Sequence, residues 1–182
     1  MTQQEIKVDN ISVEIIYDQF AESPRNWCNA TKFIMFHKRY LFPNEAGIRH
    51  GDYASWNEMK DALDKEYKWV YPVFMYDHGS VAFSVNSFEC RWDSGHVGFI
   101  VSNEGNAHEA YINVTEELKE FAHYINGEVY GVRVFEDTEE IDSCYGYYGY
   151  DHEASGLKDE LDSYLTRVTT EEIKQQILNQ LS

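Results

Sequence analysis

The sequence predicts an α+β fold, with a mainly antiparallel sheet and three to four helices packed on one face and at the C-terminus. Short apolar runs alternate with polar residues as in strands, and two such runs flank a turn-like tripeptide. The helical stripes lie between and after the strand runs instead of following each strand in turn, which favours segregated helices and strands. The chain has 182 residues and no Pro-, Gly- or Ser-rich linker, so we expect a single acidic domain over residues 1–182.

The first part of the chain is expected to contribute two strands and one helix. Residues 10–17 alternate apolar and polar side chains and predict a strand, and residues 31–40 are suited to a strand buried on both faces. Ser55 and Glu58 have the spacing of a capping box, in which two side chains satisfy backbone N–H groups at a helix start. Apolar residues recur at helical spacing after them, so the sequence predicts a helix over 55–67.

The central part predicts a hairpin, a further strand and the clearest helix. Residues 69–76 and 80–88 are apolar runs of strand type that flank an Asp-His-Gly turn at 77–79. Residues 96–101 predict another strand. The helix is predicted over 115–126, because its apolar residues form one stripe and an Asn-Gly pair at its end supplies a stop.

The last part predicts two strands followed by two helices. Residues 129–135 and 141–148 have strand patterns and are joined by the acidic segment 136–140. A helical stripe then runs from Leu157 to Val168. A second helix is expected to begin where Thr169 and Glu172 have capping-box spacing.

The charge of the chain is strongly negative and unevenly spread. Thirty-two acidic and fifteen basic side chains give a net charge of −17, and residues 104–142 alone contain eleven acidic and two basic ones. Such a surface repels phosphate backbones and anionic membranes, so we expect no nucleic-acid binding through a basic face and no membrane binding. A row of carboxylates can instead compete for a basic groove, since DNA presents about one negative charge per 1.7 Å. The alternative is a solvated face that keeps the protein soluble.

This acidic concentration supplies the candidate partner-binding residues. Like charges on a helix cost roughly 0.2–0.5 kcal/mol per pair, so a surface that retains them is suited to a cationic partner. Each carboxylate would pair with Lys or Arg of that partner. The candidates are Glu136, Asp137, Glu139, Glu140 and Asp142 at the tip of the predicted hairpin, and Glu116, Glu117 and Glu120 on the polar side of the predicted helix.

A second group of residues suggests a small hydrolase or metalloenzyme as an alternative. Ser, His and Asp can supply a nucleophile, a base and an orienting acid, and this group consists of His78, Asp93, Ser94 and His96. The segment Asp93-Ser94-Gly95 lacks the Gly-x-Ser-x-Gly frame of a nucleophile elbow, and its residues are also common in turns. We therefore expect no catalytic residues and no enzymatic activity.

The sequence gives no clear sign of a metal or cofactor site. Cys28, His37, His78, Cys90 and His96 are suitable metal ligands, but no Cys-x-x-Cys or His-x-x-x-His pair exists. No Gly-rich phosphate loop or dinucleotide fingerprint is present either. The widely spaced cysteines fit reduced thiols, and no signal-like start or membrane-length apolar run is visible. We therefore expect no metal, no cofactor and a cytoplasmic location.

The segment 145–150, Tyr-Gly-Tyr-Tyr-Gly-Tyr, has two interpretations. Alternating tyrosines suit a strand whose rings pack into the sheet. Tyrosine is also enriched at binding hot spots, so this segment could flank an interface beside the acidic hairpin tip. The sequence leaves open whether it faces core or partner.

Five sequence blocks resemble a family of small acidic proteins of phages and plasmids. They are Ser-Pro-Arg-Asn-Trp at 23–27, Tyr-Asp-His-Gly at 76–79, Cys-x-Trp-Asp-Ser-Gly-x-x-Gly-Phe-Ile at 90–100, Gly-x-Val-Tyr-Gly at 127–131 and Cys-Tyr-Gly-Tyr-Tyr-Gly at 144–149. The blocks extend over most of the chain, and Trp-Asp-Ser-Gly is the most specific of them. The family includes a type II-A anti-CRISPR protein, an inhibitor of the RNA-guided Cas-nine nuclease, which this chain resembles in length and acidity.

The resemblance implies that the chain is an inhibitor encoded by a mobile genetic element and acting in the cytoplasm of a bacterial host. Its expected partner is the type II nuclease with bound guide RNA, which holds the guide–target duplex in a positively charged channel. An acidic surface in that channel would block DNA binding or cleavage. The alternative is an acidic DNA mimic directed at another host defence or DNA-binding protein, such as a restriction enzyme.

Overall fold

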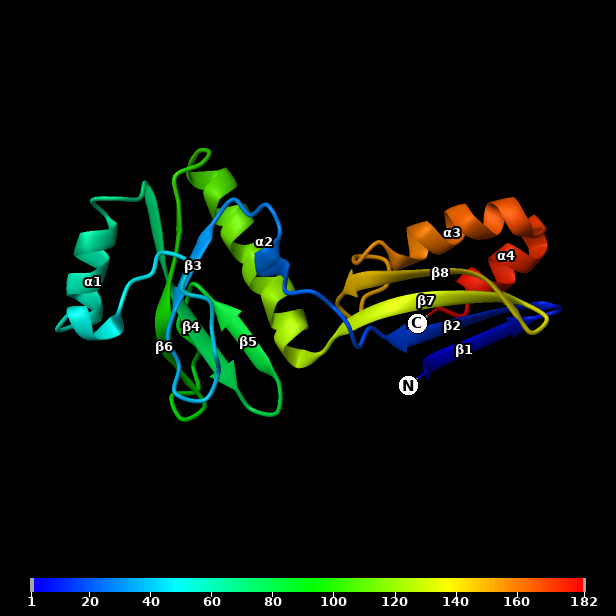
Figure 1. The fold of residues 1–182 in the computed structure, drawn as a ribbon, viewed down its shortest axis with the longest axis horizontal. Coiled ribbons are helices and arrows are strands. Elements are labelled where there is room, and N and C mark those ends of the chain that lie inside the picture. The colour runs from blue at the N-terminus through cyan, green and yellow to red at the C-terminus, as the bar shows by residue number, and fades with distance from the viewer. Residues whose placement is uncertain (1, 182) are drawn as a thin grey trace. The chain divides into compact units, whose positions relative to one another are not determined.

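The computed structural model describes residues 2–181 and confirms the α+β class (Figure 1). It contains two four-stranded antiparallel sheets and four α-helices within that range. The contacts of the chain gather in two compact units. Unit 1 consists of Met1–Glu22 and His123–Ser182, and unit 2 of Ser23–Ala122. The sequence predicts one domain without a linker, whereas each of the two sheets has its own core.

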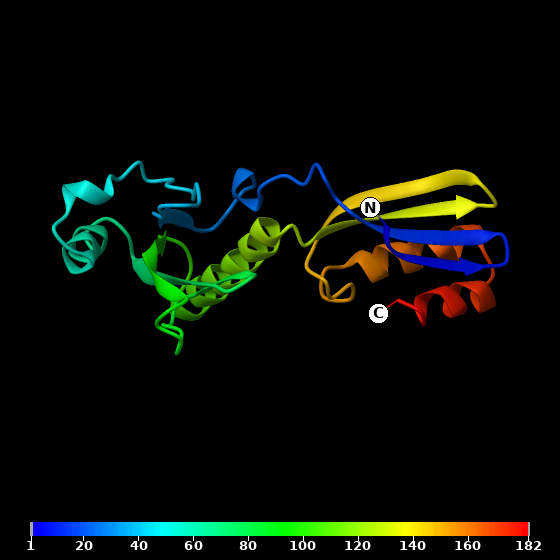
Figure 2. The same cartoon turned by 90° about the horizontal axis from the view of Figure 1, so that it is seen from below.

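Unit 1 is a sheet with two helices on one face. The strand order is β1-β2-β7-β8, and every neighbouring pair is antiparallel. Figure 2 shows both helices on the same side of these strands. The elements are β1 (Thr2–Val8), β2 (Ile11–Tyr17), β7 (Val129–Glu136), β8 (Glu139–Tyr148), α3 (Leu157–Val168) and α4 (Glu171–Leu178).

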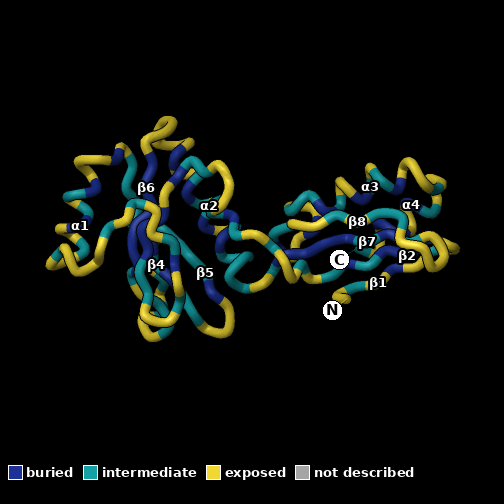
Figure 3. Tube along the Cα trace, viewed as in Figure 1, coloured by how far each residue is buried: buried dark blue, intermediate teal, exposed yellow. Residues whose placement is uncertain are grey.

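The core of unit 1 lies between the helices and the inner sheet face. Alternate residues of β2 and β7 point to this face because side chains alternate along a strand. The buried residues include Val13, Ile15, Val132 and Val134 of the strands and Leu157, Leu161, Leu165 and Ile177 of the helices. Figure 3 shows the buried positions along the middle of these strands and on the inner sides of the helices. The outer face carries Arg133 between Glu14 and Glu140.

Unit 2 is built around the second sheet, with strand order β3-β6-β4-β5. Helix α2 contributes its first part to this unit, and its residues from His123 onward belong to unit 1. The elements are β3 (Lys32–Met35), α1 (Trp56–Leu63), β4 (Trp69–Asp77), β5 (Val81–Ser84), β6 (Ser94–Ser102) and α2 (Ala107–Asn126), with short 3-10 helices at Pro24–Asn26 and His50–Asp52.

Helices cover both faces of this second sheet, which corrects the expectation of helices on one face. Consecutive residues Phe33 and Ile34 of β3 point to opposite sides. The Phe33 ring packs edge-on against Phe121 of α2, with centroids 5.3 Å apart. Ile34 belongs instead to the buried cluster that includes Met59 and Leu63 of α1. Sheet and helices therefore form three layers in unit 2.

Most predicted elements are present, with one unpredicted strand and with differences at the ends of several elements. Helix α2 begins at Ala107 instead of Thr115, and strand β1 was not predicted. The strand predicted over 31–40 ends at Met35. Thr170, and not Thr169, caps α4 by accepting a hydrogen bond from the backbone N–H of Ile173 at 3.4 Å. No helix within residues 2–181 is long and apolar enough to span a membrane.

Candidate functional site

The acidic β7–β8 turn lies beside the β1–β2 turn in unit 1. The backbone N–H of Asp137 donates a hydrogen bond to the carbonyl of Asn10 at 2.6 Å, and the Asn10 amide donates to the Glu136 carboxylate at 3.0 Å. Figures 1 and 2 show the α3–α4 connection at the same end of this sheet. We call this region the acidic end. Its carboxylates are Asp9, Glu136, Asp137, Glu139, Glu171 and Glu172.

The β7–β8 turn crowds three exposed carboxylates into four consecutive residues. Glu136 and Glu139 are directly opposite each other on the paired strands and flank the turn residues Asp137 and Thr138. Like charges at directly opposite positions destabilise a sheet. Asp137 also has a φ of +55°, in the left-handed region that few non-glycine residues adopt. The turn is therefore kept despite both electrostatic and conformational costs.

Cations to neutralise these carboxylates are scarce in unit 1. Unit 1 contains eighteen acidic and five basic side chains, a net charge of −13, whereas unit 2 contains fourteen and ten, a net charge of −4. Arg133 is already engaged with Glu14 and Glu140, and Lys174 with Asp162 and Glu171. Among residues 2–181 no ion pair joins Glu136, Asp137 or Glu139 to a basic side chain. Most of the excess negative charge thus lies in unit 1.

Glu140 and Asp142 do not extend this turn as a single patch, because the sheet directs them to opposite faces. Glu140 pairs with Phe135 on the outer face, where the Nε of Arg133 donates to its carboxylate at 2.8 Å. This hydrogen bond lowers the pKa of Glu140. Asp142 pairs with Val134, whose side chain is in the core, so it lies on the helix-covered face.

Asp142 and Glu136 both lie close enough to α3 to affect Tyr164. Burial raises the pKa of Tyr164, and the negative charges of Asp142 and Glu136 raise it further. The Tyr164 hydroxyl donates to the carbonyl of Ile141 at 3.2 Å. The acidic end therefore continues from the β7–β8 turn toward helix α3.

Glu117 faces the interior of unit 2, and its prediction as a partner-binding residue is wrong. Its carboxylate accepts hydrogen bonds from the Arg25 guanidinium, the Thr31 hydroxyl and, at 2.9 Å, the backbone N–H of Ala30. Only 13% of the Glu117 side chain is exposed. The polar side of α2 is covered here by the segment that follows Ser23, so the carboxylate binds groups of its own chain.

The other two predicted helix residues differ in exposure. Glu116 is exposed, whereas Glu120 is half-buried and interacts within the chain. Both belong to unit 2, while the predicted hairpin residues belong to unit 1. The acidic end of unit 1 is therefore the candidate surface that the structure supports best.

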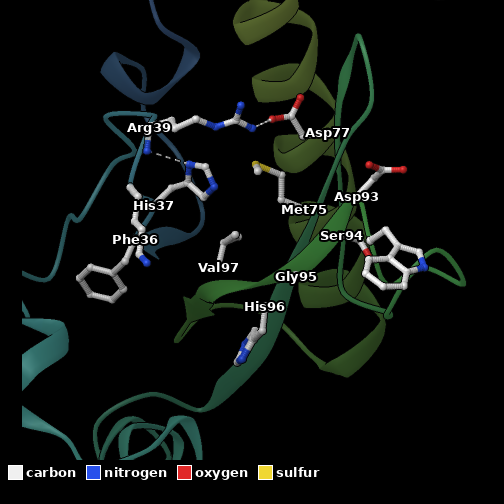
Figure 4. Close-up of a pocket in the computed structure, with 12 residues that line it drawn as sticks. Phe36, His37, Arg39, Met75, Asp77, Asp93, Ser94, Gly95, His96 and Val97 are labelled. Atoms are coloured by element: carbon white, nitrogen blue, oxygen red, sulfur yellow. Dashed lines mark hydrogen bonds and ion pairs between the residues drawn. The ribbon is translucent and has the colours of Figure 1, made fainter.

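Three residues of the alternative hydrolase site, Asp93, Ser94 and His96, line a cavity of about 720 Å3 in unit 2, whereas His78 does not line it. Figure 4 shows His37 and Arg39 on one side of it, Asp77 and Asp93 on the other, and Met75 and Val97 between them. The remaining lining residues are Phe36, Lys38, Trp92, Ser94, Gly95 and His96. The cavity thus lies between the loop after β3 and the adjoining parts of β4 and β6.

These residues do not form the arrangement of a serine hydrolase. The Ser94 hydroxyl donates to the backbone carbonyl of Cys90. The Nδ1 of His78 lies 3.3 Å from the Asp93 carboxylate. The Nε2 of His96 lies 2.8 Å from the carbonyl of Gly98, and its ring packs against Trp56 and Phe74. Neither histidine is positioned as a base for Ser94 by these contacts.

Among residues 2–181 no group of three or more His, Cys, Asp or Glu side chains is arranged to hold a metal ion. Burial also lowers the pKa of His96, which favours its neutral form. In the described part of the chain the candidate metal ligands therefore do not form such a group.

The tyrosines of the 145–150 segment divide between core and surface. Tyr145 and Tyr150 are exposed by 48% and 68%. Tyr147 is half-buried against the unit 1 core, and burial raises its pKa. The Tyr148 hydroxyl donates to the carbonyl of Glu22. The segment is thus partly structural, with the exposed Tyr145 ring lying over Gly131 of β7 and the exposed Tyr150 ring lying 6.2 Å from the His123 ring.

One exposed residue of the cavity, Trp92, was noted in the sequence only as part of the Trp-Asp-Ser-Gly block and not as a binding residue. Trp92 is 96% exposed although it lines the cavity. A signal was available, since a tryptophan between Arg91 and Asp93 in a turn segment has no apolar neighbours to pack against. The ion pair between Arg39 and Asp77 joins residues thirty-eight positions apart and had no such signal.

Comparison with known proteins gives no relative from which a function could be transferred. No protein-family model matches the chain, and no curated protein or solved structure matches it.

Proposed function

We propose that this chain inhibits a guide-loaded type II CRISPR nuclease by presenting the acidic end of unit 1 to the basic channel of the enzyme. The observation that carries this proposal is the exposed turn in which Glu136, Asp137 and Glu139 crowd together without a cationic partner in the described chain. Carboxylates held close together at the surface offer binding energy to Lys and Arg of another protein.

The physical basis is competition for positive charge. A type II nuclease holds its guide–target duplex in a positively charged channel and reads the adjacent motif with arginines. Charged groups placed opposite such a channel accelerate association and give it a strong dependence on salt. A net charge of −13 on unit 1 supplies the long-range attraction, and the acidic end supplies the contacts.

The choice of nuclease depends on the sequence blocks. Trp-Asp-Ser-Gly at 92–95 and the four other blocks resemble the family with an anti-CRISPR member. These blocks lie largely in unit 2, whereas the proposed contact surface is in unit 1. The proposal therefore combines a target suggested by resemblance with a binding surface argued from charge and exposure.

The structure modifies the set of residues that we expect at the interface. Glu136, Asp137 and Glu139 form the centre of the proposed surface, and Asp142 lies beside them toward α3. Glu140 contributes less, because Arg133 already neutralises it. Glu116 and Glu120 remain secondary candidates in unit 2, and Glu117 is excluded.

The test is plasmid cleavage by a guide-loaded type II nuclease with and without the chain, repeated across a salt series. A triple variant, Glu136→Lys, Asp137→Asn and Glu139→Lys, changes the net charge by five units at the acidic end. Its control, Glu5→Lys, Glu22→Gln and Glu153→Lys, makes the same change at other exposed positions of unit 1. Asn suits position 137 because it tolerates positive φ.

We expect the unchanged chain to suppress cleavage, with suppression weakening as salt rises. The control variant should still inhibit, and the acidic-end variant should not. Equal inhibition by the two variants would contradict the assigned surface. Full cleavage in the presence of the unchanged chain at low salt would contradict the target, and a pull-down from host lysate would then identify another DNA-binding protein as the partner.

A further inference from the structure

The cavity of unit 2 holds an oriented carboxylate beside an exposed aromatic ring. Asp93 lines the cavity and is about one-third exposed. The Cys90 thiol donates to its Oδ2 at 3.3 Å, and the Nδ1 of His78 lies 3.3 Å from the same oxygen. Because both contacts converge on Oδ2, they fix the plane of the carboxylate and leave Oδ1 to a ligand.

Trp92 adds a binding element that folding does not explain. Its side chain is 96% exposed and lines the same cavity, directly before Asp93 in the chain. An indole face attracts cations through its quadrupole, and among aromatic rings it does so best. A fixed carboxylate next to an exposed indole is a combination that recognises a positively charged group.

The other charged groups of the cavity favour a cation over an anion. Arg39 and Asp77 form an ion pair with each other, so their charges largely cancel, and the Tyr40 hydroxyl also donates to Asp77 at 3.0 Å. Lys38 is exposed on a flexible side chain. The Asp93 carboxylate is consequently held in place without a permanent positive charge beside it. Its neighbour His78 is charged only when protonated.

The ring of His37 is arranged to remain neutral and adds no cation to the wall. Its Nδ1 accepts hydrogen bonds from the backbone N–H groups of Arg39 and Tyr40 at 3.2 and 3.3 Å, so the ring carries its proton on Nε2. Burial and the neighbouring charge of Arg39 lower the pKa of His37. A bound cation would therefore meet no charged imidazole from this residue.

We infer that this cavity binds a guanidinium group, stacked on Trp92 and hydrogen-bonded to Asp93, with Met75 and Val97 forming the apolar floor. A guanidinium is favoured over an ammonium because it is planar, weakly hydrated and stacks on aromatic rings. The volume of about 720 Å3 accommodates a whole arginine side chain. The inference concerns unit 2 alone and is independent of the proposed function.

The experiment is an NMR titration of the full chain, observing its four tryptophan indole N–H signals. The probe is arginine with both backbone ends blocked, and its control is the equally blocked citrulline, which has the same shape without the charge. Trp92→Phe identifies the relevant signal. We expect a saturable shift of the Trp92 signal with arginine and none with citrulline.

Variants distinguish the proposed site from a general attraction to an acidic protein. Asp93→Asn should weaken arginine binding at least about tenfold, which is the effect of one lost charge-assisted hydrogen bond. Glu89→Gln removes one charge at an exposed position that does not line the cavity and should leave binding unchanged. If Asp93→Asn fails to fold, Trp92→Ala serves instead, since its exposed ring contributes little to the core, and binding is then followed through the backbone amide signals of the chain.

The inference would be overturned by an equal response to arginine and citrulline, or by a response to inorganic phosphate alone, which would assign the cavity to an anion at Lys38 and Arg39. Free L-arginine is tested in parallel with the blocked form. Equal binding of the two forms indicates that the cavity recognises the guanidinium alone, as it would recognise an arginine side chain on the surface of a partner protein. Tighter binding of the free amino acid indicates a small-molecule ligand that also uses the α-amino and carboxylate groups.

Discussion

In unit 2 the Arg25 guanidinium and the Glu117 carboxylate form an ion pair in which only 5% and 13% of the two side chains remain exposed. Arg25 also donates to Glu45 and to the carbonyl of Thr31, and it lies over the Phe33 ring at 3.9 Å. Burial by itself would lower the pKa of Arg25, but the hydrogen bonds that Arg25 donates to Glu45 and Glu117 outweigh it and raise this pKa. The pair thereby fixes the segment after Ser23 against α2.

Replacing Glu117 should destabilise unit 2 strongly. Glu117→Gln removes the negative charge and leaves Arg25 buried with Glu45 as its remaining partner, and the loss should be about 3 kcal/mol in the free energy of unfolding. Urea unfolding followed by tryptophan fluorescence measures it, because all four tryptophans lie in unit 2. The neighbouring exposed change Glu116→Gln should alter stability by less than about 0.5 kcal/mol. Similar losses for the two variants would refute the structural role of Glu117.

Gly98 should not tolerate a side chain. A Cβ atom at this position would lie 2.0 Å from the carbonyl oxygen of Ile34, and its φ of +150° disfavours other residues. Gly98→Ala should therefore lower the free energy of unfolding of unit 2 by about 3 kcal/mol, by separating β6 from β3. Tryptophan fluorescence in urea again measures the loss. Gly51→Ala, where a Cβ has open space, is the control, and a wild-type midpoint for Gly98→Ala would contradict this close approach.

Relieving the crowding in the β7–β8 turn should stabilise unit 1. Glu139→Gln removes the repulsion with Glu136 directly opposite, and the expected gain is about 0.5 kcal/mol in the free energy of unfolding. Far-ultraviolet circular dichroism during urea unfolding measures the gain. The same variant should inhibit the nuclease less well. Glu22→Gln, which removes an exposed charge elsewhere in unit 1, should change neither property, and a loss of stability in Glu139→Gln would disprove the cost assigned to this turn.

The stability of unit 1 should fall in mild acid because of His152. This ring is buried edge-on against Tyr130, and its Nδ1 has no hydrogen-bond partner among the described residues. Burial lowers the pKa of His152 below its ordinary value of 6.5. Well above pH 6.5 His152 is neutral in both the folded and the unfolded chain. As the pH falls below 6.5, His152 is protonated first in the unfolded chain, where its pKa is higher, so protonation favours unfolding.

Urea midpoints measured by circular dichroism between pH 8 and pH 5 should therefore decrease below pH 6.5. Part of this decrease should disappear in His152→Phe and persist in His108→Gln, which changes an exposed histidine. His37 and His96 in unit 2 also have pKa values lowered by burial and act in the same direction. A midpoint for unit 1 that rises toward pH 5 would exclude this linkage.

Local patterns predicted individual elements well when a helix or hairpin carried its own signals. The Ser55–Glu58 spacing predicted the start of α1, where the Ser55 hydroxyl accepts from the backbone N–H of Glu58 at 3.2 Å. The start of α2 was missed although Asn106 and Glu109 form a similar cap: the Asn106 side chain accepts from the N–H of Glu109 at 3.1 Å, and Glu109 accepts in return at 3.0 Å.

Features that depend on distant residues could not be predicted. Strand β1 is an edge strand of mostly polar residues, so it shows little periodicity and is fixed by its pairing with β2. The Glu117 carboxylate is held in an ion pair with Arg25, which lies ninety-two positions earlier in the sequence. The sequence also did not indicate on which face of β8 each side chain lies, because irregularities in the register direct Glu140 and Asp142 to opposite sides. The acidic turn itself was predicted, since it consists of consecutive residues.

The pairing of β2 with β7 has a consequence for synthesis on the ribosome. Because these strands come from opposite sides of the 23–122 segment, β1 and β2 cannot complete their sheet until the residues of β7 have emerged. All four strands of the second sheet are synthesised before that point. Unit 2 can therefore fold while the β1–β2 hairpin still lacks its partner strand β7. The β1–β2 hairpin is thus synthesised first but is among the last parts of the chain to be packed into its sheet.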